Sequence, residues 1–403
     1  MSPRYYSLDV FRGATVALMI LVNNPGTWSD MFKPLKHAPW HGCSPTDLVF
    51  PFFLFAVGNA MSFVIPKLKG ASSELFWKKI LKRSCLIFFI GLFLNWFPFL
   101  EWNGQSLIFR EWVSSSDANH GVRILGVLQR IALSYLLSSI LAYYFRPRTL
   151  IYISFIILFG YWGFTHFFGS TDPYSLEGWF GTSIDKIILT PSHMYKGEGV
   201  PFDPEGLIST LPAVVQVLFG YLVGLFIKGQ GSVNWLWKNL PESKELHFKM
   251  LSGLYVVGFV LLTLGWIWSL GFPINKKIWT SSYVLYTTGL AIMTIGGMIW
   301  YIEVLGVKNW ITKFFDVFGK NPLFIFVLSG VLPKSLALIH IIDGHNENGD
   351  PIYISPLTWI YRHICAPISD IPEVGSFFYS LLFLVFMWLI VYFMDKKRIY
   401  VKV

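Results

Sequence analysis

The chain has 403 residues, of which 54% are hydrophobic and only 14% are charged. Soluble domains carry about a quarter charged residues, so the composition excludes a soluble globular fold and predicts an all-α integral membrane protein. The net charge of +9 does not indicate nucleic-acid binding, because lysine and arginine gather in the cytoplasmic loops of membrane proteins.

Apolar runs predict about ten transmembrane helices, which form a single transmembrane domain over residues 1–403. The predicted spans are residues 7–23, 46–66, 84–100, 123–145, 149–168, 207–227, 250–271, 280–302, 322–342 and 374–394. Residues 355–368 are apolar but short, and proline and charges interrupt them. We expect an interfacial or re-entrant segment there, with an eleventh crossing as the alternative.

The distribution of basic residues predicts that both termini lie in the cytoplasm. With the N-terminus inside, the inner segments hold about twice as many lysines and arginines as the outer segments, which is the bias that membrane topology follows. The three long loops, 24–45, 101–122 and 169–206, then lie outside. We therefore expect chemistry on a bulky substrate at the outer face.

Polar residues inside the predicted spans are candidate site residues, because a charge at mid-membrane costs roughly 2.5–3.5 kcal/mol. Asp9 and Arg12 lie at i, i+3 and either pair with each other or face a ligand. Gln129 and Arg130 lie deeper, in the fourth span, where an arginine favours an anionic partner or ligand. Asp47 begins the second span, which is also the pattern of an ordinary helix-start acid.

The loop before the second span, "FKPLKHAPWHGCSPTD", holds the densest set of reactive side chains. His37 and His41 lie at i, i+4, but Pro39 between them argues against a helix. No HExxH motif or third ligand accompanies them, so we predict no metal site. A loop histidine alone does not indicate a catalyst.

Several blocks of the sequence, taken in order, resemble the transmembrane acetyltransferases typified by heparan-α-glucosaminide N-acetyltransferase. They are "SLDVFRGATVALMILVNNPG", "KHAPWHGCSPTDLVFPFFLFAVG", "RILGVLQRIALSY", "FDPEGLISTLPAVVQVLFGYLVG" and "FGKNPLFIFVLSGVL". The stretch "DLVFPFFLFAVG" after "HAPWHG" is the most specific of them. The likeness is to the bare core found in bacterial relatives, and it predicts a multi-pass protein of the bacterial cytoplasmic membrane.

The resemblance implies an enzyme that moves the acetyl group of cytoplasmic acetyl-CoA to a glucosamine-type amino sugar on the extracytoplasmic side. Acetyl-CoA is then a co-substrate, and no permanently bound cofactor is expected. The resemblance implies that His37 is the catalytic residue and that Asp47 and Asn23 match further family positions. His41 departs from the family, since the lysosomal enzyme has asparagine there, and this leaves the acceptor's identity open.

Acetyl transfer from a thioester to an amine needs a base and stabilisation of an oxyanion. A histidine titrates near neutrality, so His37 can accept the proton or carry the acetyl group itself. Asp47 would hold its tautomer, and Asn23 would donate a hydrogen bond to the thioester carbonyl or orient the acceptor.

The two substrates imply further candidate residues. The phosphates of CoA need counter-charges and hydrogen-bond donors, for which Arg130, Gln129 and Arg12 are the candidates. The candidates for binding the acceptor are Trp40, His41 and Asn24, which lie around the predicted reaction centre.

Two other functions fit the same pattern. One is an O-acyltransferase that modifies a cell-envelope glycan. The other is a transporter of small organic anions, with Arg130 as the counter-charge of the substrate. The partners we expect are acetyl-CoA, an amino-sugar or glycan acceptor and the lipid bilayer, and the sequence leaves a homodimer open.

Overall fold

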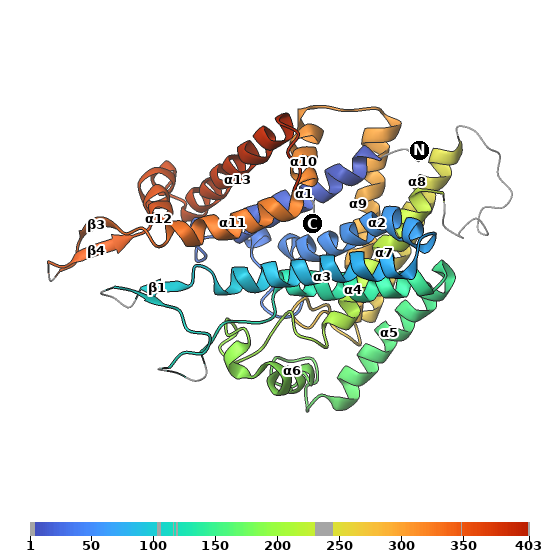
Figure 1. Cartoon of the computed structure of the whole chain (residues 1–403), viewed down its shortest axis with the longest axis horizontal. Helices are drawn as coiled ribbons and strands as arrows, with labels where there is room; N and C mark the ends of the chain where they lie inside the picture. The colour runs from blue at the N-terminus through green and yellow to red at the C-terminus, as the bar shows by residue number, and fades with distance from the viewer. Residues whose placement is uncertain are drawn as a thin grey trace.

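The computed structural model describes residues 5–102, 106–115, 117, 120–229, 245–347 and 349–401, without the side chains of residues 245–247. The described chain is a bundle of helices with two small antiparallel strand pairs (Figure 1). The helices are α1 (Tyr6–Asn23), α2 (Val49–Lys69), α3 (Ser73–Trp96), α4 (Val127–Tyr144), α5 (Pro147–Phe168), α6 (Gly181–Leu189), α7 (Thr210–Ile227), α8 (Glu245–Trp268), α9 (Ser281–Ile299), α10 (Trp310–Lys320), α11 (Pro322–Leu336), α12 (Pro356–Ile360) and α13 (Pro372–Lys396). Strand β1 (Leu100–Trp102) pairs with β2 (Leu107–Phe109), and β3 (Ile341–His345) pairs with β4 (Pro351–Ile354).

The helices identify a multi-pass membrane protein. Seven helices of the described chain are long and apolar enough to cross a membrane, or eight if α10 and α11, which meet at an angle of 81°, form one broken span. Helices α3 and α4 are not among them, because α3 carries several basic residues in its first half and α4 carries serines and Arg130. The structure therefore supports a smaller number of crossings than the sequence suggests, and ten stays a prediction.

The predicted third span, 84–100, begins too late. Helix α3 starts at Ser73, because the hydroxyl of Ser72 accepts a hydrogen bond from the backbone N–H of Leu75 at 3.3 Å and caps the helix. Long basic side chains can pack their stems along a helix while the charged ends stay in water, so the basic run does not stop the helix.

The predicted ninth span, 322–342, is also wrong at its end. Helix α11 ends at Leu336, and residues 341–345 form strand β3, in which Ile341 faces Ile354 of β4. A short apolar run does not distinguish a helix from a strand.

Residues 355–368 form a short helical segment. Helix α12 continues through a π turn (Tyr361–Cys365) and a 3₁₀ turn (Ala366–Ile368). At about 1.5 Å per residue this segment is shorter than a hydrocarbon core of about 30 Å. It fits an interfacial or re-entrant segment better than an eleventh crossing.

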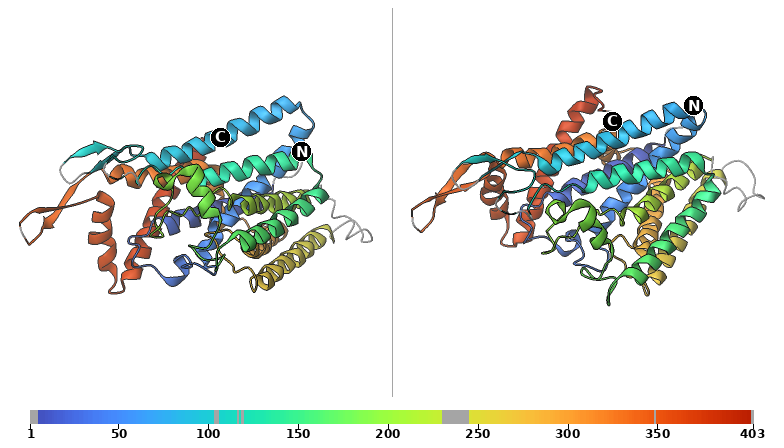
Figure 2. Two further views of the ribbon diagram at one scale, coloured as in Figure 1. Left: turned by 90° about the horizontal axis from the view of Figure 1, so that it is seen from below. Right: turned by 60° about the horizontal axis from the view of Figure 1, so that its bottom comes forward.

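Figures 1 and 2 show both strand pairs at one end of the long axis and the links α2–α3 and α4–α5 at the other. Strands β1 and β2, in the predicted outer loop 101–122, therefore lie at the end opposite two links that the sequence assigns to the inner side. Residues 1–4 and 402–403, at the termini predicted to be cytoplasmic, lie outside the described residues.

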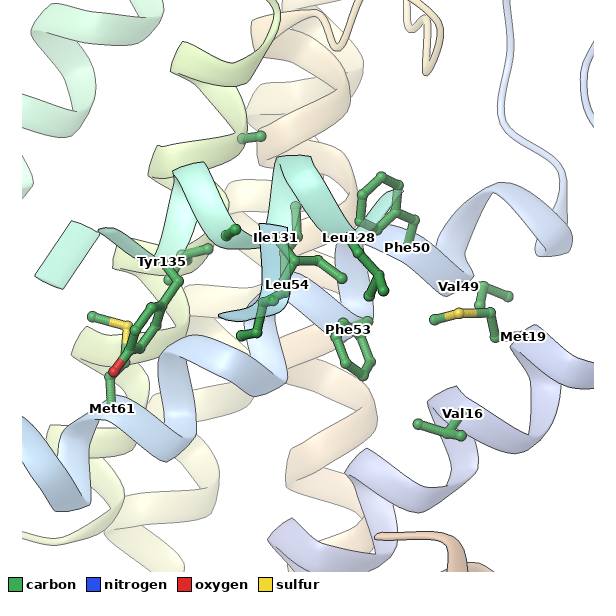
Figure 3. Close-up of a cluster of buried hydrophobic side chains, with 14 of the residues drawn as sticks. Val16, Met19, Val49, Phe50, Phe53, Leu54, Met61, Leu128, Ile131 and Tyr135 are labelled. Carbon is green, nitrogen blue, oxygen red and sulfur yellow. The ribbon is translucent and has the colours of Figure 1, made fainter. Parts of the chain in front are cut away.

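Helix α2 runs through the centre of the bundle and packs closely on α7. A Cβ on Gly58 would lie 2.0 Å from the carbonyl oxygen of Val217, and one on Gly220 would lie 2.1 Å from that of Phe55. Glycine at both positions lets the two backbones approach, as in other membrane bundles. Buried side chains of α1, α2 and α4 fill the adjoining core (Figure 3). This packing holds α2 in place, and the candidate site lies directly before its first turn.

Candidate active site

His37 and Asp47 form a close pair. Asp47 lies in a 3₁₀ turn (Pro45–Leu48) directly before α2, and its side chain is only 1% exposed. Its Oδ1 lies 2.7 Å from Nδ1 of His37. Its Oδ2 accepts hydrogen bonds from the backbone N–H groups of Ala38 and Ser44 and from the hydroxyl of Ser44, each at 3.0 Å. Asp47 thus caps the turn and also holds the histidine.

This contact sets the tautomer of the imidazole. An ionised carboxylate only accepts hydrogen bonds, so the contact with Asp47 places a proton on Nδ1 of His37. The other ring nitrogen, Nε2, then has a free lone pair and can accept a proton or attack a carbonyl. The imidazole is 43% exposed, so a substrate can reach it.

The link between α8 and α9 holds the loop that carries His37 through hydrogen bonds. The backbone N–H of Gly42 donates to the carbonyl of Ile274 at 2.7 Å, and Nζ of Lys277 donates to the carbonyl of Pro39 at 2.7 Å. From α9 itself, the hydroxyl of Tyr283 donates to the backbone carbonyl of Asp47 at 2.6 Å. Segments more than 200 residues apart in the chain therefore build the site together.

Lys276 is the third charged group at the pair. Its Nζ lies 3.1 Å from Nδ1 of His37 and 3.4 Å from Oδ1 of Asp47. Burial lowers the pKa of Lys276, and the charge of Asp47 opposes this effect by favouring the ammonium form.

Cys43 lies near the pair but is a poor nucleophile. Its thiol is free, and burial, together with the negative charge of Asp47, raises its pKa to about 12. The thiolate is the reactive form of cysteine, so Cys43 is not activated here. His37 is the better candidate for proton or acyl transfer.

His37 lies at the junction of two cavities. The first, which we call the polar cavity, has a volume of about 310 Å³, and the second, the small cavity, has about 150 Å³. Both are lined by His37, Val127, Glu205 and Lys276. The polar cavity is also lined by Ala38, Trp40, Asp47, Arg123, Tyr195, Glu198, Pro204, Lys277 and Trp279, and the small cavity by Met19, Val22, Asn23, Thr46, Val49 and Phe50.

Ion pairs of Arg123 and Lys277 lie at the wall of the polar cavity. Arg123 donates to both carboxylate oxygens of Asp203, at 3.0 and 2.6 Å, and also contacts Oε2 of Glu205. Lys277 donates to Oε2 of Glu198 at 2.6 Å. The cavity is therefore lined by charges of both signs, which suits a polar ligand.

A third cavity, which we call the basic cavity, has a volume of about 290 Å³ and is lined by the cations Arg12, Arg83 and Lys320. The guanidinium of Arg83 lies over the ring of Tyr135, 4.9 Å from its centroid. Lys320 pairs with Asp316 and Asp395, each at 2.9 Å.

The basic cavity lies close to the small cavity. Val49 lines the small cavity and Phe53 lines the basic cavity one turn further along α2. On α4 the neighbours Val127 and Leu128 divide between the two cavities in the same way. The basic cavity therefore lies within about one helical turn of the small cavity, which His37 lines.

The structure brings some of the predicted site residues together. Asn23, the last residue of α1, lines the small cavity with His37. Trp40 lines the polar cavity, and its indole N–H donates to the carbonyl of Tyr174 at 2.8 Å.

Other predicted site residues lie elsewhere. His41 lines neither cavity at His37; its Nδ1 lies 3.4 Å from the amide nitrogen of Asn275, and burial lowers its pKa. The amide of Asn24 donates to the carbonyl of Ile20 at 2.9 Å, and Asn24 lines neither cavity at His37.

The three residues predicted to hold CoA also lie in different places. Arg12 lines the basic cavity, and its guanidinium contacts Asp9 and the carbonyl of Gly319. Gln129 donates to the carbonyl of Ile124 at 2.8 Å. Neither Gln129 nor Arg130 lines the three cavities described above.

Arg130 is fully buried among protein groups. Its guanidinium contacts Ser209, donates to the carbonyl of Gly206 at 3.2 Å and lies over the ring of Trp279, 5.0 Å from the centroid. Its Nε and Nη1 have no hydrogen-bond partner among the described residues. The cation is therefore not exposed to either cavity at His37.

Sequence reasoning missed Lys276, Glu205 and Arg83 as site residues. Lys276 looks like any other outer-loop lysine in "FPINKKIW", and Arg83 like part of a basic inner loop. Glu205 lies within the block "FDPEGLIST". Two acidic residues close together, Asp203 and Glu205, were the feature of the sequence that could have indicated a site there.

Comparison with known proteins identifies the family. The family model described as "Heparan-alpha-glucosaminide N-acetyltransferase, catalytic" matches residues 4–255. The chain is 25% identical over 383 residues to heparan-alpha-glucosaminide N-acetyltransferase of Homo sapiens, which covers 81% of this chain and 53% of the relative. It is 24% identical over 382 residues to the Mus musculus protein of the same name, covering 82% of this chain and 54% of the relative.

The chain therefore spans about half the length of these curated relatives. The matched residues 4–255 include His37, Asp47 and Glu205, while Lys276 lies beyond them. Because the family model matches more than half of the chain, the chain belongs to the heparan-alpha-glucosaminide N-acetyltransferase catalytic family.

Proposed function

We propose that the chain is a membrane-bound acetyltransferase that moves an acetyl group from acetyl-CoA to an amino sugar. The observation that carries the proposal is the His37–Asp47 pair at the junction of the polar and small cavities. Such a pair supplies an oriented base, and two cavities that meet at one base give room for two substrates.

In the proposed reaction the acceptor lies in the polar cavity and the acetyl thioester in the small cavity. Nε2 of His37 takes a proton from the acceptor nitrogen, and that nitrogen attacks the thioester carbonyl carbon. The new N–C bond forms, the C–S bond breaks, and the imidazolium returns the proton to the sulfur of CoA. The carbonyl oxygen becomes an oxyanion on the way, and the amide of Asn23 and the ammonium of Lys276 are the nearby donors to stabilise it. An acetyl-histidine intermediate is the alternative order of the same steps.

The basic cavity is the proposed site of the phosphates of CoA. Arg12, Arg83 and Lys320 supply positive charge there, and anionic phosphates bind such groups with charge-assisted hydrogen bonds. The pantetheine arm would pass along α2 and α4 to the small cavity. The proposal keeps Arg12 from the sequence prediction, and it replaces Arg130 and Gln129 with Arg83 and Lys320.

The proposed orientation places the basic cavity towards the cytoplasm and the polar cavity towards the extracytoplasmic side of a bacterial cytoplasmic membrane. Support comes from the bias of basic residues and from strands β1 and β2, which lie at the end of the molecule opposite the links α2–α3 and α4–α5. The acceptor class follows the names of the human and mouse relatives, which specify an α-glucosaminide and N-acetyl transfer.

The transporter alternative loses its main support. It relied on Arg130 as the counter-charge of an anion, and Arg130 is buried against Ser209, Gly206 and Trp279. O-acetylation uses the same donor and the same base, so it is separated from N-acetylation by the product.

The test uses purified protein in sealed liposomes, with acetyl-CoA carrying a radiolabelled acetyl group on one side and glucosamine on the other. The proposal predicts label on glucosamine as an alkali-stable amide. Label in alkali-labile esters would identify an O-acyltransferase, and no transfer to amine or alcohol acceptors would contradict the proposed function.

A further inference from the structure

Glu205 has a distinct position at the site. Among the carboxylates of the described residues that line the two cavities at His37, it alone lines both. Asp47 and Glu198 line the polar cavity only. The side chain of Glu205 is 12% exposed. A group bound to it would therefore lie where the two substrates must meet.

One oxygen of Glu205 is available to a ligand. Oε2 contacts Arg123, whereas Oε1 accepts no hydrogen bond from a described residue. Arg123 also makes two hydrogen bonds to Asp203, so its single positive charge is shared between two carboxylates. Burial acts to raise the pKa of Glu205, but the charges of Arg123 and Arg130 outweigh it and lower that pKa. The carboxylate is therefore ionised at neutral pH.

We propose that Oε1 of Glu205 binds the ammonium group of the acceptor beside His37, so that the site selects primary amines over alcohols. This inference rests on the proposed function and names the acceptor class of the same site. An aliphatic amine is largely protonated at neutral pH, and a carboxylate is the group that binds it most strongly. The ammonium first gives one proton to Nε2 of His37, which passes it to water. The neutral amine then attacks the thioester, the neutral imidazole takes the second proton from the attacking nitrogen, and the imidazolium returns that proton to the sulfur of CoA.

The charge of Lys276 gives Glu205 a second role. Lys276 lines both cavities and would repel an arriving ammonium. Glu205 lies in the same two cavities and supplies the opposite charge. An alcohol acceptor needs no such compensation, because its hydroxyl is neutral. The pairing of one cation and one carboxylate around His37 is what an amine acceptor requires.

The experiment measures the binding of glucosamine and of glucose to the detergent-solubilised protein in the absence of acetyl-CoA. These two sugars differ only in the amine at position 2. We expect the wild-type chain to bind glucosamine at least about tenfold more tightly than glucose at neutral pH, as one hydrogen bond between charged groups provides. Glu205→Gln should lose that difference. Glu177→Gln, at an exposed position outside the cavities, is the matched control and should keep it.

Equal binding of the two sugars by the wild-type chain would overturn the inference without any variant. Retention of the preference by Glu205→Gln would overturn it as well. Binding of acetyl-CoA by Glu205→Gln checks that the variant is folded, and Glu205→Asp, which keeps the charge, should retain part of the preference. The binding assay needs no turnover, so its result does not depend on the proposed function. If Glu205→Gln transfers acetyl to glucosamine with an unchanged KM, the role of Glu205 is wrong but the proposed acetyltransferase function stands.

Discussion

Nζ of Lys276 lies 3.1 Å from Nδ1 of His37, on the side of the imidazole that faces Asp47. The lysine comes from the link between α8 and α9, and the histidine from the loop before α2. The ammonium of Lys276 pairs with Oδ1 of Asp47 at 3.4 Å, and this ion pair joins the two parts of the chain that form the site.

Lys276→Met should lower kcat for acetyl transfer by roughly 10- to 100-fold, because it removes a positive charge beside the reaction centre. Steady-state values of kcat for the variant and the wild type measure this effect.

Lys277→Met is the comparison for this variant, because Lys277 contacts Pro39 and Glu198 and not His37. We expect a smaller loss of rate. Lys276→Arg should recover part of the rate. A kcat in Lys276→Met equal to that of the wild type would contradict a role of Lys276 in the reaction.

Asp185 predicts how stability depends on pH. It is fully buried in α6, and one of its oxygens accepts a hydrogen bond from the backbone N–H of Leu207 at 2.9 Å. Burial raises the pKa of Asp185 to about 7, against about 3.9 in an unfolded chain. The folded chain therefore holds this proton more tightly, so the stabilisation is complete below about pH 4 and is lost as the pH rises to about 7.

The thermal midpoint of the solubilised protein should consequently fall between pH 5 and 8, and Asp185→Asn should reduce that fall. The exposed Asp172→Asn is the control and should leave it unchanged. An equal fall in Asp185→Asn and the wild type would mean that Asp185 does not titrate in this range.

Arg83 tests the donor site. Arg83→Gln should raise the KM for acetyl-CoA by about tenfold, as expected for loss of one charge-assisted contact to a phosphate, and should leave the KM for the acceptor unchanged. Arg148→Gln, at an exposed position at the start of α5, should change neither value. Equal increases in the KM for acetyl-CoA and in the KM for the acceptor would contradict the placement of CoA in the basic cavity.

Much of the helical framework follows from the sequence, because apolar runs of membrane length leave little choice of structure. The ends of the helices were harder to predict. Helix α3 starts at Ser73, within a basic stretch that does not look like part of a span. The isoleucines of β3 form a strand because they pair with β4, and this pairing is not visible in the local sequence. Helices α6 and α10 were not predicted, since both are shorter than a membrane span.

The site was predictable in part. His37, Asp47 and Asn23 lie in or beside recognisable blocks within the first 50 residues, and the structure places all three around the small cavity or its histidine. Lys276 and Glu205 could not be assigned, because their role depends on loops that meet only in the folded chain. The depth of Arg130 in its span suggested a ligand, and the structure shows protein partners in its place.

The rate of acetyl transfer by His37→Ala tests the central claim most directly, measured together with its binding of acetyl-CoA. Transfer should be abolished while acetyl-CoA binding is retained, because His37 is an exposed loop residue whose loss costs little folding energy. Asp47→Asn should give an intermediate rate, since it disturbs the tautomer without removing the base, and His41→Ala should have the mildest effect. Full transfer activity in His37→Ala would contradict the account.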